Sequence, residues 1–178
     1  MALYAKNPDA IAQGHELFTA NQAQLVALPA DIRMFVLENE VKHFGNADLF
    51  DQLLKAYTQT TDSSYKADIL AALTSTTDPT QIAKLVDKFE DADTIKPQDL
   101  RSWFRGVLNN HAGEQAAWDW LRNEWQWLEK TVGGDMEFTT YITVIAGVFR
   151  TPERLTEFKA FFEPKLQTPG LTLSLIHI

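Results

Sequence analysis

The stretch Ala116-Ala117-Trp118-Asp119-Trp120-Leu121-Arg122-Asn123-Glu124-Trp125-Gln126-Trp127-Leu128 contains four of the five tryptophans in the chain. Trp118, Leu121, Trp125 and Leu128 recur with the 3.6-residue period of an α-helix, so they form one apolar stripe, with charged and amide side chains on the opposite side. The pattern predicts a single helix through this stretch, with these four side chains in the core.

Trp120 and Trp127 lie seven residues apart and form a second aromatic row beside the first. A large aromatic ring removes roughly 150–250 Å² from water when it is buried, so a helix with two such rows needs neighbours on more than one side. We therefore expect this helix to lie at the centre of a layered array. An aromatic cage for a ligand is the alternative interpretation.

Length and composition limit the class of protein. The 178 residues are 45% hydrophobic, which is enough for one sizeable core. Sixteen basic against 24 acidic residues give a net charge of −8, and no run of Lys or Arg occurs, so a nucleic-acid backbone would be repelled. The absence of cysteine suits a reducing compartment, and the sequence shows neither a signal-peptide layout nor an apolar run of the roughly 18 residues that span a membrane. We therefore expect a soluble, cytoplasmic protein with no nucleic-acid or membrane partner.

Capping residues, several of them followed by proline at the first helical position, mark a series of helix starts. They are Asn7-Pro8, Pro29-Ala30-Asp31, Asn46, Ser63, Asp78-Pro79, Pro97 and Thr151-Pro152. At Asp78, the glutamine three positions later, Gln81, predicts a capping box. The segment 138–149 is rich in Thr, Ile and Val and suits a strand, but a single strand among helices has no pairing partner, so we predict a helix. In the second helix, one side is shared by Ile32, Phe35, Val36, Asn39 and His43.

The helix starts recur with a period. The first helices of successive pairs are predicted to begin near Pro8, Asn46, Pro79, Glu114 and Pro152, at intervals of 33 to 38 residues. Intervals of this size are typical of helical-hairpin repeats. We therefore predict an all-α fold of about nine helices, an α-solenoid of HEAT/armadillo-like hairpins, whose concave side offers a surface for a peptide or a neighbouring domain.

The chain is poor in catalytic motifs. Its histidines, His15, His43, His111 and His177, belong to no H-E-x-x-H helix, and the sequence has no G-x-S-x-G elbow, phosphate-binding glycine loop or cysteine. We expect no catalytic residue, metal site or cofactor in this chain. Arginine binds a carboxylate through two parallel hydrogen bonds, although surface salt bridges are its commoner use. The candidates for contact with a peptide are Arg101, Arg105, Tyr141 and Arg150. The candidates for the structural core are Trp118, Leu121, Trp125, Leu128, Phe161 and Phe162.

Several short motifs resemble one known family. They are Ile95-Lys96-Pro97-Gln98-Asp99-Leu100, Asn109-Asn110, Ala117-Trp118-Asp119-Trp120-Leu121, Phe149-Arg150-Thr151-Pro152-Glu153 and Phe161-Phe162. Together they are similar to the C-terminal helical domain of zinc aminopeptidases of the aminopeptidase N family, of the bacterial type. The same domain ends the endoplasmic-reticulum aminopeptidases. The resemblance covers about Leu3 to Thr172.

The resemblance implies a HEAT-like bowl that closes over a catalytic domain, encloses the active-site chamber and limits the access of peptides to it. The parent enzyme removes N-terminal residues from peptides with a zinc ion held by an H-E-x-x-H helix and a distant Glu, and meets the substrate amine with a G-A-M-E-N stretch. Neither motif occurs here, so no catalytic or zinc-binding residue is carried over. We expect a single domain, residues 1–172, truncated at both ends, and a non-native or disordered tail, residues 173–178. A free-standing helical-repeat module that binds a peptide or a protein is the alternative.

Overall fold

The computed structural model describes residues 7–132 and 136–165, and these ranges contain ten α-helices and no strand. The helices are α1 (Pro8–Asn21), α2 (Ala30–His43), α3 (Ala47–Gln59), α4 (Ser63–Thr74), α5 (Pro79–Val86), α6 (Pro97–Asn109), α7 (Glu114–Asn123), α8 (Trp125–Val132), α9 (Met136–Val148) and α10 (Pro152–Phe162). Two short 3₁₀ helices, η2 (Gln22–Ala27) and η3 (Glu163–Lys165), follow α1 and α10. The all-α prediction is confirmed, and the β-branched segment after residue 136 is a helix.

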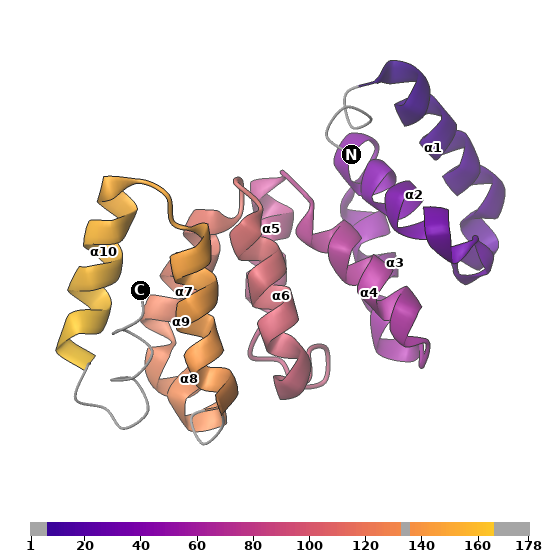
Figure 1. The fold of residues 1–178 in the computed structure, drawn as a ribbon. Coiled ribbons are helices and arrows are strands. Elements are labelled where there is room, and N and C mark those ends of the chain that lie inside the picture. Colours follow the sequence, from indigo (N-terminus) through magenta and orange to yellow (C-terminus); the bar gives the residue numbers. More distant parts are fainter. Residues whose placement is uncertain (1–6, 133–135, 166–178) are drawn as a thin grey trace.

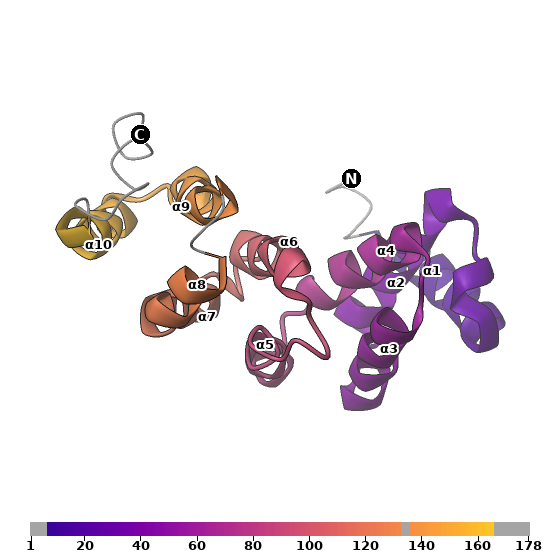
Figure 2. The same cartoon turned by 90° about the horizontal axis from the view of Figure 1, so that it is seen from below.

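The helices stack as hairpins in an elongated two-layer array (Figure 1). Seen along the helices, α2, α4, α6 and α9 form one row, and α3, α5 and the α7–α8 pair form the other (Figure 2). Within hairpins α1 packs on α2, α3 on α4 and α8 on α9, and between hairpins α2 packs on α4, α4 on α6 and α6 on α9. The predicted array of helical hairpins is therefore present, although α5 packs more on α4 and α7 than on α6.

Side chains cap the starts of five of the ten described helices, α1, α3, α4, α5 and α10. The carboxyl or amide oxygens of Asn7, Asn46 and Asp78 accept backbone N–H groups of the first turns of α1, α3 and α5. The predicted capping box at α5 is wrong. Gln81 does not return to the N–H of Asp78; its amide oxygen accepts the hydroxyl of Thr76 at 3.1 Å, and the Asp78 N–H donates to that same hydroxyl.

The tryptophan stretch is two helices rather than the single helix predicted. The chain leaves helical geometry at Glu124, which has φ −99° and ψ 19°, and α8 begins at the next residue. No proline or glycine marks the break. The rings of both helices nevertheless meet one neighbour, because Trp118 and Trp125 lie with ring centroids 6.1 and 5.4 Å from Phe162 of α10.

The buried side of α2 differs from the side that the sequence pattern brings together. His43 is exposed, Ile32 and Phe35 are half-buried, and the inner side carries Arg33 and Glu40. The Nε of Arg33 donates to Asp68 of α4 at 2.6 Å, and its other nitrogens reach the carbonyl of Val26 at 2.8 Å and the hydroxyl of Ser64 at 3.2 Å. This buried ion pair joins the first two hairpins.

Helices α4 and α6 approach closely at Gly106. A Cβ built there would lie 2.7 Å from the side chain of Thr74, far inside van der Waals contact. The spacing of these two helices therefore requires glycine at position 106. The same spacing sets the width of the surface between α4 and α6.

One prediction concerns residues outside the described ranges: the domain boundary at residue 172 with the tail 173–178. Within the described ranges, every helix is too short or too polar to cross a membrane.

Candidate functional site

Three adjoining pockets line the row formed by α2, α4, α6 and α9. The largest, about 520 Å³, lies between α2, α4 and α6; a second, about 380 Å³, lies between α6 and α9; and a third, about 200 Å³, lies beside Tyr57 and the start of α6. The first two share Arg105 and Asn109, and the first and third share Leu70 and Ser102. We call the two larger pockets, which flank α6 and share Arg105 and Asn109, the α6 groove.

The wall of the groove between α2, α4 and α6 is polar and largely satisfied by its own contacts. Asn110 donates from one amide nitrogen to the carbonyls of Thr74 (2.9 Å) and Thr76 (2.6 Å), which closes the C-terminal end of α4. At the α2 end, the ammonium of Lys42 lies 3.6 Å from the carboxylate of Glu38. Such a wall offers little unpaired charge to a ligand.

Arg105 is the exception. It is exposed at the middle of the groove, and among the described residues its guanidinium has neither an ion pair nor a hydrogen bond. Asn109, one turn later, donates to the carbonyl of Arg105 at 2.9 Å. The centre of the groove is therefore a free cation on a ridge of α6, with an amide beside it.

The other candidates for peptide contact lie elsewhere. Arg101 is partly buried one turn before Arg105 and takes part in an interaction within the chain. Arg150 is exposed between α9 and α10, outside the pockets described above. The prediction that Tyr141 faces a peptide is wrong, because its side chain is 1% exposed and its ring centroid lies 5.4 Å from that of Phe104 in the core.

Residues that the sequence reasoning missed complete the groove. They are Ser102 and Asn109 on α6 and Thr140, Thr143, Val144 and Gly147 on α9. Ser102 lies three residues before Arg105 and Asn109 four residues after it, so the helical period could have predicted that they share its side of α6. The groove residues on α9 could not be predicted in this way, because the sequence does not show which side of α9 packs on α6.

The tryptophans belong to the core. Trp118, Leu121, Leu128 and Phe162 have no exposed surface, and Trp125 is 7% exposed; Phe161 is half-buried against them. An open aromatic cage is therefore not formed by these rings.

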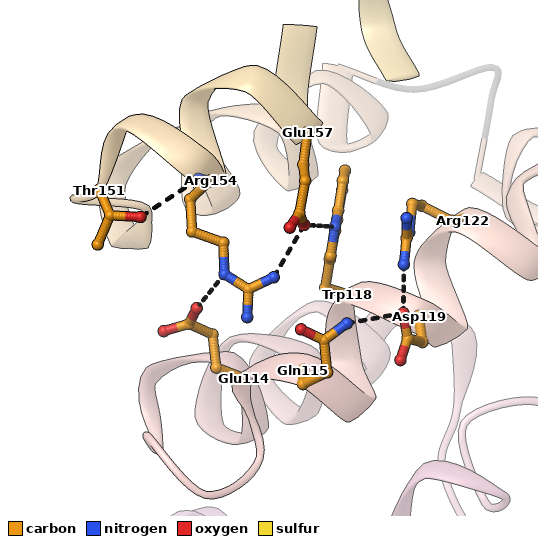
Figure 3. A network of polar contacts seen from close by, with 8 residues as sticks. All are labelled: Glu114, Gln115, Trp118, Asp119, Arg122, Thr151, Arg154 and Glu157. Atoms are coloured by element: carbon orange, nitrogen blue, oxygen red, sulfur yellow. Dashed lines mark hydrogen bonds and ion pairs between the residues drawn. The ribbon is translucent and has the colours of Figure 1, made fainter. Parts of the chain in front are cut away.

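A polar network holds α10 against this core (Figure 3). The indole N–H of Trp118 donates to Glu157 at 2.9 Å. The guanidinium of Arg154 lies 2.9 Å from the Glu157 carboxylate and 2.8 Å from the carboxylate of Glu114 on α7, so it bridges the two. It also lies over the ring of Phe149. Since the arginine and Glu114 are mostly buried, the network fixes α10 on α7 and is structural.

Two groups with shifted pKa values lie outside the α6 groove. Burial raises the pKa of Tyr57, whose hydroxyl donates to Asp99 at 3.3 Å, so this hydroxyl stays protonated at neutral pH. The one strongly shifted carboxyl, Asp91, lies in the loop before α6, where the bond from Lys88 holds its pKa at about 2. In the described part of the chain, no group of three or more His, Asp or Glu side chains is placed to hold a metal ion.

Comparison with known proteins identifies the family. A family model described as the ERAP1-like C-terminal domain matches residues 1–177. The chain belongs to this family. Aminopeptidase N of Lactobacillus helveticus is 60% identical over 171 residues, 96% of this chain, and aminopeptidase N of Lactobacillus delbrueckii subsp. lactis is 52% identical over 164 residues, 92% of it. Glutamyl aminopeptidase of Bos taurus is 27% identical over 155 residues, 87% of it.

This ERAP1-like C-terminal domain is a small part of those relatives. It spans 20% of each of the two bacterial proteins and 16% of the bovine one. The match extends over both halves of the groove, because the aligned segments cover nearly all of the chain.

Proposed function

We propose that this chain is the C-terminal cap domain of a zinc aminopeptidase, which removes N-terminal residues from peptides. The cap encloses the active-site chamber and controls which peptides enter it. The observation that carries the proposal is the 60% identity, over 96% of the chain, with one fifth of a protein named aminopeptidase N. The zinc and the catalytic residues belong to the rest of the parent enzyme, and we place that enzyme in the cytoplasm because the chain has no cysteine.

The architecture suits this role. Hairpins in a solenoid contact their neighbours along the whole array, which makes an extended wall that keeps its shape. The row α2, α4, α6 and α9 presents pockets lined by both polar and apolar side chains, whereas the opposite layer carries four of the five tryptophans. We assign the grooved row to the chamber side, facing the catalytic domain and the peptide substrates.

A chimera tests the proposal. This chain replaces the matching segment of the Lactobacillus helveticus aminopeptidase N, and the chimera is compared with the unmodified enzyme on an aminoacyl-arylamide and on peptides of increasing length. We expect the chimera to hydrolyse both substrate classes and the isolated chain to hydrolyse neither and to bind no stoichiometric zinc.

The control narrows the groove without touching the core. Gly147 lines the pocket between α6 and α9, and a Cβ built on it meets nothing within 4 Å. In the chimera, Gly147→Trp should slow hydrolysis of long peptides more than that of the arylamide. If both substrates respond equally, or if the isolated chain hydrolyses the arylamide, the cap assignment fails.

A free-standing module that binds a peptide or a protein is the second candidate, and the groove itself favours it. Immunodetection in the source cells separates the two. A band at the 20.2 kDa of this chain supports the module, whereas a band about five times heavier supports the enzyme.

A further inference from the structure

We propose that the α6 groove binds an extended peptide segment and that Arg105 receives the carboxylate of an acidic side chain within that segment. The inference deepens the proposed function, because it names the substrate class that the grooved row prefers, but it rests on the surface of this chain alone.

The first step of the argument is charge. The chain has eight more carboxylates than basic side chains, and three of its six arginines, Arg33, Arg122 and Arg154, each contact an aspartate or glutamate. Arg105 has no such partner among the described residues although it lies in a groove. A guanidinium binds a carboxylate through two parallel, charge-assisted hydrogen bonds. The free partner of Arg105 is therefore an incoming anion, and the carboxylate is the anion that a peptide carries.

The second step is position. Arg105 belongs to both of the larger pockets, so one lies on each side of it. Packed helices lie about 8–10 Å apart, so the two pockets are separated by about one helix spacing, which an extended chain crosses in about three residues. A peptide that occupies both pockets continues past Arg105 in both directions. The carboxylate that reaches Arg105 then comes from a side chain and not from the end of the peptide.

The third step is the chemical character of the two ends of the α6 groove, one at α2 and the other at α9. At the α2 end, Glu38 and Lys42 already pair with each other, so the wall leaves no unpaired cation there for a second acidic residue. At the α9 end, Gly147, one turn after Thr143, leaves open space, so a peptide backbone can approach closely. The groove thus prefers one acidic residue, in the middle of the segment.

The experiment uses the purified chain and three fluorescein-labelled peptides of about nine residues, measured by fluorescence anisotropy. The first has a central Glu and neutral capped ends, the second has Gln in its place, and the third has the central Gln but a free C-terminal carboxylate. We expect the Glu peptide to bind about ten-fold more tightly than the Gln peptide, a margin that shrinks as salt is added.

Matched variants assign the preference to the site. Arg105→Gln should bring the Glu peptide to the affinity of the Gln peptide, and Arg105→Lys, which keeps the charge but loses the two-point contact, should fall between. Arg150→Gln removes the same charge from the exposed α9–α10 loop and should change nothing. Gly147→Leu, which fills one pocket, should weaken both peptides.

Three outcomes overturn the inference: no binding of any peptide, equal affinity for the Glu and Gln peptides, or a preference that survives Arg105→Gln. A fourth outcome also overturns the inference: if the third peptide binds as tightly as the Glu peptide, the groove recognises a free C-terminal carboxylate instead. These results are distinguishable from a failure of the cap assignment, because the chimera can hydrolyse peptides whether or not Arg105 selects among them.

Discussion

The buried pair Arg33–Asp68 allows a sharp test of how the first two hairpins are joined. Arg33 is 4% exposed and Asp68 is 8% exposed, and the aspartate accepts the 2.6 Å bond of the Arg33 Nε. Asp68→Leu leaves a buried guanidinium with the Val26 carbonyl and the Ser64 hydroxyl as hydrogen-bond partners and with the ring of Tyr65 beside it, but without a carboxylate. Breaking a buried pair in this way costs about 3–5 kcal/mol, a large part of the roughly 5–15 kcal/mol that stabilises a domain.

The double variant Arg33→Met with Asp68→Leu removes both charges and should recover most of the loss, since replacing a whole buried pair by apolar groups is often neutral. Urea unfolding is followed by circular dichroism and by tryptophan fluorescence. All five tryptophans lie at or after Trp103, so fluorescence reports on the second half of the array and circular dichroism on all of it.

A repeat array is coupled only between nearest neighbours, so the destabilised first hairpins can unfold before the rest. The midpoint of the single variant should therefore fall further by circular dichroism than by fluorescence. A loss below about 1 kcal/mol in the single variant, or a double variant no more stable than the single one, would refute the reasoning.

Further predictions concern three other regions. Trp125→Ala truncates a core ring and should cost about 3–5 kcal/mol in urea unfolding, whereas Gln126→Ala on the exposed side of α8 should stay within about 0.5 kcal/mol; similar midpoints would contradict the face assignment. Gly106→Ala should lower the melting temperature in calorimetry. Overpacking costs about 1–3 kcal/mol, which outweighs the gain of up to about 1 kcal/mol in helix propensity. A higher melting temperature would show that α4 and α6 can separate. The pKa of Asp91 is lowered from 3.8 to about 2, so its contribution to stability is present above pH 3.8 and is lost as the pH falls through 2; a carboxyl NMR titration should give that midpoint, and Lys88→Met should raise it.

The sequence predicts the fold well where apolar side chains alone face the core. In α3 and α6, every residue that the helical period assigns to the inner side is buried. In α2 the inner side includes Arg33 and Glu40, whose partners Asp68 and His15 lie 35 and 25 residues away in other helices. From the sequence alone, a charged residue is predicted to be exposed. Its burial can be predicted only when its partner is known, and no local sequence pattern indicates a partner in another helix.

The site was only partly predictable for a similar reason. Arg105 stood out by its chemistry, and the structure places it at the centre of the groove. Tyr141 was wrongly assigned to the surface, because α9 is apolar on several sides and only its packing on α6 decides which of them is inward. The break at Glu124 is likewise a consequence of tertiary contacts, since the local sequence favours a continuous helix.

The polar contacts between successive hairpins also bear on how such an array changes in evolution. Arg33 meets Asp68 of the next hairpin, Lys84 meets Asp51 of the one before, and Glu114 meets Arg154 of α10. These contacts differ in burial from one junction to the next. A rearrangement that separated the first two hairpins would leave Arg33 buried without Asp68, whereas loss of the exposed Lys84–Asp51 pair would cost little, so we expect the first two hairpins to be inherited as one unit.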